Sequence, residues 1–417
     1  MKPIPKELIT KSKFWKPKLN PGFDLKSNSW FDITGLQKKG AKCKLREIKG
    51  PIIRCSKISI KPNQKQRNLL KSWLDIYRQI YNFTVKYFRK HKICGQYKAR
   101  DIIRKKITQT PILWCLIKQS EIPLHTCNNA IFDVVKAYET AMINLKAGNI
   151  KYFRLRYKKI TKSTHTLVFE PNTFNKIGTG LNYEKLNDLH PASKIFTECD
   201  VRLQYNQRTK QFMLHIPEYR EIHLKYNRYN RCALDPGMRI FQSAYSDNGV
   251  IFQFATDKTN GSIKKLINRV EKVKSKPEKR YKKYANRLRT KIKNKVADLH
   301  WKVARFLCKR FDNIMIGNMS TKGIIKKHRS VLTPGMKRFC IALSHYKFRD
   351  RLQKKCEEFS VNFACVDESY TSKTCGKCGE MKENLGGDKI FKCEELNCGY
   401  IMNRDIHGAR NILIKNT

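Results

Sequence analysis

Two closely spaced pairs of cysteines near the end of this 417-residue chain constrain its fold more than any other feature. Two residues separate Cys375 from Cys378, four separate Cys393 from Cys398, and fourteen lie between the pairs. Short cysteine pairs joined by a loop are typical of tetrahedral Zn²⁺ coordination, and the glycines in "TCGKCG" and "LNCG" suit metal-binding turns. No further open ligand position is evident, so the pattern predicts a structural zinc element at about residues 370–402.

The other eleven of the fifteen cysteines are scattered singly along the chain. A disulfide framework requires an oxidising compartment, but the N-terminus, "MKPIPKELITKSKFWKPK", lacks the apolar core of a secretory signal. The cysteine pattern therefore favours an intracellular, reducing environment.

The net charge restricts the partners. The chain has 88 Lys and Arg against 34 Asp and Glu, a formal charge of +54, so a nucleic acid is the favoured partner. An anionic membrane surface is the alternative, but no run of eighteen apolar residues exists, and we expect no membrane association.

The oligomeric state is not fixed by the sequence, and a monomer is favoured. The basic arm is compatible with nuclear entry in a eukaryotic or viral setting.

Residues 1–50 are predicted to be a basic flexible arm, because they mix Lys, Pro, Gly, Asn and Ser with few apolar clusters. Residues 57–62 alternate like a strand, and residues 122–147 form an amphipathic helix that Gly148 ends. We expect a helical lobe over residues 63–148. Its first helix has apolar residues at helical spacing: Leu69, Leu70, Trp73, Tyr77, Ile80, Tyr81, Thr84 and Phe88.

The next part of the chain is predicted to be rich in β-strands. "KYFRLRYKK" and "THTLVFEP" interleave aromatic and basic residues, and a hairpin follows in which alternate residues are apolar. These strands, over residues 149–229, and the strand within residues 51–62 are expected to form one barrel. Its basic aromatic surface suits base stacking, although a solvated sheet face over an aromatic core explains the same pattern. The hairpin positions are Val201, Leu203, Tyr205, Phe212, Leu214 and Ile216.

A third unit is predicted over residues 230–417. "RCALDPGMRIFQSAYSDNGVIFQF" indicates three antiparallel strands, an opening typical of a ribonuclease-H-like α/β core. Residues 261–310 contain nineteen Lys and Arg against three acids, on a helical pattern with one apolar face. "NIMIG" and "VNFACVD" predict two further strands, separated by a helix near residues 339–359, and "RDIHGARNILI" predicts a final short helix.

Two acids stand out in so basic a chain. Asp235 ends the first strand of the third unit, directly before Pro236 and Gly237, and Asp405 begins the last helix. Each alone is more simply explained as a turn residue or a helix cap. Hydrolysis of a phosphodiester by two Mg²⁺ ions, however, needs several carboxylates that converge from separate elements, so together they indicate a metal site.

The motifs "LDPG", "SYTSKTCGKCG", "FKCEELNCGY" and "NRDIHGARNI" occur in this order and resemble the RuvC-like nucleases of the TnpB family and their eukaryotic and viral relatives, the Fanzor proteins. The chain is also similar to type V CRISPR effectors. The resemblance covers about residues 57–415 and leaves the arm unmatched. It implies a multidomain α/β fold: a wedge-type β-barrel with an inserted helical recognition lobe, then an RNase H-like RuvC domain with an inserted zinc element.

The resemblance also implies a function. It indicates an RNA-guided DNA endonuclease of a mobile element, in which a guide RNA pairs with one strand of a double-stranded target DNA beside a short flanking motif. The RuvC site would use Mg²⁺, with Asp235 as the first catalytic aspartate and Asp405 as the last.

The chain departs from the TnpB pattern in the middle of the nuclease. TnpB relatives end the second RuvC strand with Glu, whereas this chain has Gly317 in "IMIGNMSTKG". Fanzor proteins resemble this chain in that substitution and in placing a Glu ahead of the zinc knuckle, which implies that Glu368 supplies the missing carboxylate. Asp367 is the rival, but alternation along a strand directs the two side chains to opposite faces.

Two other functions remain open at this point. One is a catalytically decayed RNA-guided or plain DNA-binding protein, against which Asp235, Glu368 and Asp405 argue. The other is a transposase or its accessory protein, although no His-hydrophobic-His pair accompanies a tyrosine nucleophile.

Overall fold

The computed structural model describes residues 18–19, 52–91, 95–174, 197–222, 229–255, 257–325 and 332–417, and single positions between 181 and 195. The rest of the predicted arm therefore lies outside the described residues. The chain divides into two compact units, residues 53–220 and residues 221–417 with 1–52.

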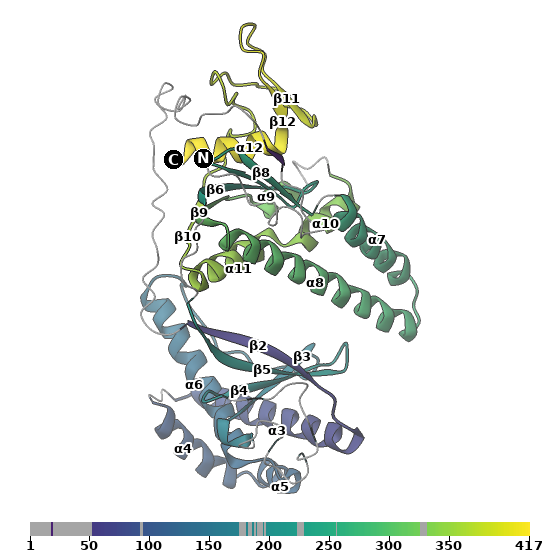
Figure 1. The fold of residues 1–417 in the computed structure, drawn as a ribbon. Helices are drawn as coiled ribbons and strands as arrows, with labels where there is room; N and C mark the ends of the chain where they lie inside the picture. The colour runs from purple at the N-terminus through teal and green to yellow at the C-terminus, as the bar shows by residue number, and fades with distance from the viewer. Residues whose placement is uncertain are drawn as a thin grey trace. The chain divides into compact units, whose positions relative to one another are not determined.

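Among the residues that the structure describes, the first unit combines a sheet with four helices (Figure 1). The sheet has the strand order β2-β5-β4-β3, and α3 and α6 both contact β3. Its helices are α3 (Gln64–Phe88), α4 (Gln96–Thr108), α5 (Pro111–Ser120) and α6 (Leu124–Lys146). Its strands are β2 (Ile52–Ile60), β3 (Thr164–Phe169), β4 (Val201–Asn206) and β5 (Gln211–Arg220).

The long helix α3 begins and packs as its sequence predicts. Asn63 and Gln66 form a capping box, in which each side chain accepts a hydrogen bond from the backbone N–H of the other residue. Its apolar stripe is buried against α5, α6 and β3, and Trp73 Nε1 donates a hydrogen bond to the carbonyl of Ser120. The helix α6 ends before Gly148, whose φ of 71° fits a glycine at a helix C-terminus.

Two expectations for this unit need correction. The described strands form an open sheet, with β2 and β3 at opposite edges, so the described residues contain no closed barrel. The segment "KYFRLRYKK" is not a strand, because residues 151–159 pair with no neighbouring strand in the described part of the chain. Instead, side chains of α3 hold its backbone: Asn82 Nδ2 donates to the carbonyl of Lys158, and Arg89 donates to the carbonyl of Leu155.

The second unit is built on a six-stranded sheet with the order β1-β8-β7-β6-β9-β10. The first three long strands are antiparallel, as predicted, and β6, β9 and β10 run parallel to one another. The strands are β1 (Lys18–Leu19), β6 (Tyr229–Pro236), β7 (Gln242–Ser246), β8 (Val250–Phe254), β9 (Phe311–Gly317) and β10 (Asn362–Val366).

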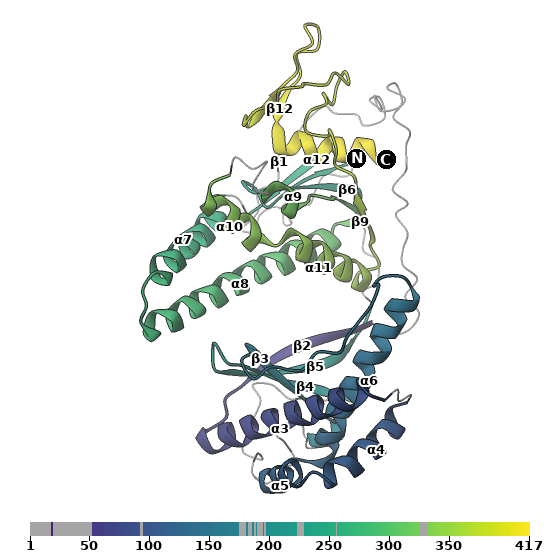
Figure 2. The same cartoon turned by 180° about the vertical axis from the view of Figure 1, so that it is seen from behind.

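Helices cover both faces of this sheet (Figure 2). One face packs on the basic helices α7 (Asp257–Lys274) and α8 (Lys279–Cys308) and on α10 (Pro334–Leu343) and α11 (His345–Glu358). The predicted apolar positions of residues 261–310 lie on the packed face, with Leu288, Ile292, Val296, Leu299 and Val303 all buried. The short α9 (Thr321–Ile325) follows β9.

The opposite face of the sheet packs on the C-terminal helix α12 (Arg404–Lys415). Between β10 and α12 the chain forms a small element with its own core and a two-stranded sheet, β11 (Ile390–Lys392) and β12 (Ile401–Asn403). No helix among the described residues has both the length and the apolar character needed to cross a membrane.

Candidate active site and cysteine cluster

The candidate acidic site lies where three parallel strands end at one edge of the sheet. β6 pairs with β9 as far as Leu234, and β9 pairs with β10 as far as Gly317. The carboxyl ends of neighbouring parallel strands meet at the same edge, and ligand sites in α/β sheets are found there. Asp235 at the end of β6 and Glu368, two residues beyond β10, therefore emerge at the same edge of the sheet, on either side of β9.

Side-chain alternation places both acids on the α12 face of the sheet. Ala233 in β6 and Ala364 in β10 belong to the core beneath α12. Asp235 and Glu368 lie two and four residues further along, and residues at even separations share one face of a strand.

The helix α12 brings the third acid to this face. Asn403 caps the helix by accepting hydrogen bonds from the N–H groups of Asp405 and Ile406, which fixes Asp405 in the first turn. One turn later, Gly408 lies against Asp235: a Cβ atom at position 408 would be 2.6 Å from Asp235 Oδ2.

Gly317 leaves room for Glu368. A Cβ atom built on Gly317 would collide with the Oε2 atom of Glu368, whose own Cβ lies 3.2 Å from the same point. The Glu368 carboxylate thus occupies the space into which a side chain at position 317 would project.

Asp367 points elsewhere. It is exposed, its Oδ2 atom accepts a hydrogen bond from Lys415 Nζ at 2.9 Å, and its Oδ1 atom accepts one from Ser369. Lys415 is in the last turn of α12, ten residues after Asp405 and thus about 15 Å along the helix axis. The Asp367 carboxylate thus forms a surface ion pair at the opposite end of α12 from Asp405.

The electrostatics of the site disfavour three bare negative charges. Burial and the neighbouring charges of Glu368 and Asp405 raise the pKa of Asp235 well above its usual value, although Asp235 keeps some exposed surface. Burial also raises the pKa of Asp405, and the guanidinium groups of Arg239 and Arg404 oppose that rise. Such a group of carboxylates gains stability from bound protons or from a cation.

Glu368 shows the same tendency. Burial raises its pKa to about 7, and the negative charge of Asp367 adds to this rise. The positive charge of Arg349 and a hydrogen bond from the backbone N–H of Met319 lower the pKa and so oppose it. Its Oε2 atom is buried and has no hydrogen-bond partner among the described residues. A buried carboxylate oxygen without a donor is a suitable ligand for a hard cation.

The three acids suit Mg²⁺ by chemical type, since Mg²⁺ in proteins is bound through a few carboxylates and retained waters. The described residues contain no group of carboxylates as close together as the four cysteine sulfurs, whose Sγ atoms all lie within 4.8 Å of one another. Looser spacing is compatible with metal ions that share carboxylates across about 3.5–4 Å.

The four predicted zinc ligands do come together. The Sγ atoms of Cys375 and Cys398 are 3.7 Å apart, and those of Cys378 and Cys393 are 3.5 Å apart. A tetrahedral Zn²⁺ with Zn–S bonds of about 2.3 Å places its sulfurs about 3.8 Å apart. The cysteine cluster can therefore hold a zinc ion.

α12 fastens the cysteine element to the sheet. His407 stacks on Phe391 at 4.1 Å between ring centroids. The fully buried Arg410 donates to the carbonyl of Gly376 at 2.7 Å, and Asn411 Nδ2 donates to the carbonyls of Thr371 and Thr374. The helix that carries Asp405 thus also anchors the cysteine element.

Sequence reasoning missed several residues of this site. The one with a detectable signal is Gly408, which lies three residues after Asp405 and so on the same side of the helix. Arg349, Arg239 and Arg404 have no signal that separates them from the other basic residues of the chain.

Two family models match the chain. The Cas12f1-like TNB domain matches residues 345–412, which include Glu368, the four cysteines and Asp405. The helix-turn-helix domain of OrfB from IS605 matches residues 53–90, which here form β2 and the single helix α3.

A TnpB-like protein of Acanthamoeba polyphaga mimivirus is 30% identical to this chain over 402 residues, which span 89% of this chain and 75% of that protein. The chain belongs to the TnpB family. This TnpB-family protein is also 26% identical to a putative transposase of Paramecium bursaria Chlorella virus 1, over 87% of each chain. Over 80 residues it is 38% identical to the CRISPR-associated endodeoxyribonuclease Cas12f1 of Sulfoacidibacillus thermotolerans.

Solved structures similar to this TnpB-family protein include a Cas12f1–sgRNA–target DNA complex. The similarity covers 87% of this chain and 98% of that one, with 15% identity and a TM-score of 0.33. A CRISPR-Cas12f ternary complex has 13% identity and a TM-score of 0.35, over 83% of this chain and 80% of that one.

Proposed function

We propose that this TnpB-family protein is an RNA-guided, Mg²⁺-dependent endonuclease that cuts double-stranded DNA. The observation that carries the proposal is the position of Glu368: its carboxylate fills the space beside Gly317, and its charge, like that of Asp405, acts on Asp235 and raises the pKa of that residue. A site that had lost its nuclease activity would not be expected to retain a carboxylate in that space.

The sheet of the second unit supports a RuvC-type assignment. Three antiparallel strands continue into two parallel ones, and the acids lie at the carboxyl ends of β6 and β10 and at the start of α12. In the proposed complex, Asp235, Glu368 and Asp405 would hold Mg²⁺, and the chemistry it would supply when bound is activation of a water and stabilisation of the leaving oxygen. Asn403 positions Asp405 by capping α12, and Gly408 leaves the space that Asp235 needs.

The proposed partners are a guide RNA and a double-stranded target DNA. The charge of +54 supplies many phosphate contacts, and the guide supplies sequence recognition by base pairing. The cysteine element would hold a structural zinc, and Arg410 and Asn411 would link that element to α12 and so to Asp405. A monomer is the simplest assembly that provides one complete set of acids.

The deciding experiment incubates the purified protein and its copurified RNA with double-stranded DNA that carries a sequence complementary to that RNA. We expect cleavage that requires Mg²⁺ and is lost in Asp235→Ala. Binding without cleavage would favour a decayed, RNA-guided or plain DNA-binding protein. Joined DNA strands would favour a transposase.

A further inference from the structure

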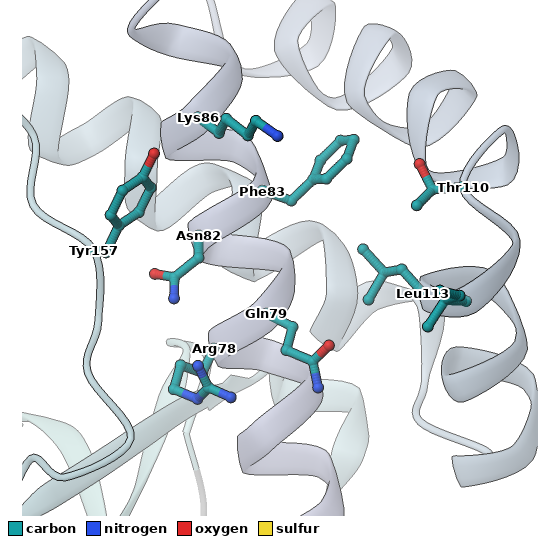
Figure 3. Close-up of a pocket in the computed structure, with 9 residues that line it drawn as sticks. Arg78, Gln79, Asn82, Phe83, Lys86, Thr110, Leu113 and Tyr157 are labelled. Atoms are coloured by element: carbon teal, nitrogen blue, oxygen red, sulfur yellow. The ribbon is translucent and has the colours of Figure 1, made fainter.

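A groove crosses the surface of the first unit along α3 (Figure 3). Figure 3 shows Tyr157 on one side of α3, Leu113 of α5 on the other, and Phe83 and Lys86 between them. The groove has a volume of about 510 Å³. Pockets of about 300–1,000 Å³ hold small organic ligands, so there is room for a nucleotide.

The wall that carries Tyr157 is fixed. Asn82 Oδ1 accepts a hydrogen bond from the N–H of Lys158 at 2.7 Å, and Asn82 Nδ2 donates to the carbonyl of the same residue at 3.1 Å. Arg89 donates to the carbonyl of Leu155 at 2.6 Å and stacks its guanidinium 4.1 Å from the centre of the Tyr157 ring. The groove is therefore formed before any ligand binds.

A partly buried ionic network also anchors this segment. Lys158 Nζ lies 3.4 Å from Asp133 in α6 and 3.8 Å from the centre of the Tyr81 ring. Asp133 also accepts a hydrogen bond from Arg202 in β4 at 3.0 Å. Two elements, α3 and α6, thus hold Lys158, and Tyr157 beside it stays 43% exposed.

The charges around the groove suit a phosphate. No acidic side chain lines it among the described residues, and its two cations are Arg78 and Lys86. Arg78 is paired with Asp75, at 2.6 Å, so its charge is largely balanced. Lys86 is exposed and forms no ion pair with any described residue, and Arg89 adds a second positive charge beside Tyr157.

We propose that this groove binds an unpaired nucleotide of a single-stranded nucleic acid, with its base against Phe83 or Tyr157 and its phosphate near Lys86. Single-strand binding sites combine aromatic stacking platforms with cations that follow the backbone. A paired base in a duplex has both faces covered by its neighbours, so a duplex cannot use the aromatic walls. The inference goes beyond the proposed function in naming a nucleotide site and depends on that function only for the choice of nucleic acid as partner.

Photocrosslinking tests the site directly. The full-length protein is irradiated with single strands of about 12 nucleotides that contain 5-iodouracil, one of RNA and one of DNA, and the crosslinked peptides are identified by mass spectrometry. We expect crosslinks at Phe83 or Tyr157, and the strand that gives them identifies the source of the nucleotide. Crosslinks only at other residues would overturn the proposal.

Variants give a second readout. Tyr157→Leu and Phe83→Leu keep an apolar side chain but remove the ring, and Lys86→Gln keeps a flexible polar side chain but removes the charge. We expect each to weaken binding of the single strand by about tenfold. Tyr219→Leu removes a ring that is 56% exposed outside the groove and should change binding little. If Phe83→Leu fails to fold, the exposed Tyr157 and Lys86 still decide the question. Equal affinities for all groove variants and the parent would refute the proposal.

The failure of this inference can be told apart from the failure of the proposed nuclease. Asp235→Ala, which removes a proposed metal ligand, should leave the crosslinks unchanged. In the other direction, a parent protein that cuts target DNA but gives no crosslinks at Phe83 or Tyr157 would refute this inference and leave the proposed nuclease standing. An excess of unlabelled duplex DNA should displace the single strand much less than unlabelled single strand does, and equal displacement would contradict the requirement for an unpaired base.

Discussion

Gly408 of α12 lies so close to Asp235 of β6 that a Cβ atom at position 408 would be 2.6 Å from the Oδ2 atom of the aspartate. Real Cβ contacts of this length do not persist, so Gly408→Ala must displace Asp235 or shift α12. We expect the variant to lose most Mg²⁺-dependent DNA cleavage, measured with guide RNA and target.

The helix itself gives this prediction its control. Ala is favoured over Gly in a helix interior by about 0.5–1 kcal/mol, so the gain in helix stability partly offsets the cost of the clash with Asp235. Gly335→Ala in α10 introduces a Cβ with no atom within 4 Å and should cut normally. Normal cleavage by Gly408→Ala would show that the position of Asp235 is not critical.

Glu368 and its neighbour Asp367 provide a matched pair of variants. Glu368→Gln keeps the side-chain shape but removes the charge that faces Asp235, so we expect cleavage to fall to background while RNA and DNA binding persist. Asp367→Asn breaks only the exposed ion pair with Lys415, and such pairs contribute about 0–1 kcal/mol. Single-turnover cleavage assays separate the two outcomes. The opposite ranking would transfer the metal-binding role to Asp367.

The raised pKa of Glu368 predicts a pH dependence for Mg²⁺ binding. Burial raises the folded-state pKa to about 7, above the ordinary 4.5, so this group stabilises the metal-free fold fully below pH 4.5 and loses that contribution as the pH rises to about 7. Above pH 7 the ionised carboxylate can bind Mg²⁺ without proton competition.

The increase in Tm that Mg²⁺ produces should therefore be larger at pH 8 than at pH 6, as measured by thermal unfolding. Glu368→Gln should make this increase smaller and less dependent on pH. An increase that is the same at both pH values in the parent protein would mean that no group of raised pKa takes part in metal binding.

Without its zinc ion, the cysteine element should lose its fixed conformation. We expect a double variant, Cys393→Ser with Cys398→Ser, to contain no zinc by elemental analysis and to be cut by proteases within residues 370–402. Because Arg410 and Asn411 of α12 bind this element, DNA cleavage should fall as well. Cys115→Ser, which changes an exposed cysteine of α5, should keep its zinc. Unchanged zinc content in the double variant would refute the cluster as the site.

Much of the second unit could be predicted because its signals are local. The Asp247–Gly249 turn, the apolar face of α8 and the "NRDIHGARN" helix each follow from neighbouring residues, and the structure confirms them as β-hairpin and helices. The Cys375–Cys398 cluster was predictable for the same reason, since metal ligands have characteristic spacings.

The errors concern pairing between distant segments. "KYFRLRYKK" has the alternation of a strand, but its backbone bonds to the side chains of Asn82 and Arg89 in α3, about seventy residues earlier in the chain. Alternation reports which side chains can share a face and says nothing about whether a neighbouring strand is available. The expected barrel failed to appear in the described residues for the same reason.

The fit between Gly317 and Glu368 makes the two positions interdependent. Parallel strands β9 and β10 offer two chain positions whose side chains compete for a single volume. A side chain introduced at position 317 would therefore push the Glu368 carboxylate out of its place. Moving the acid from position 368 to position 317 thus calls for two substitutions made together, because a Glu at position 317 needs the space that Glu368 now fills.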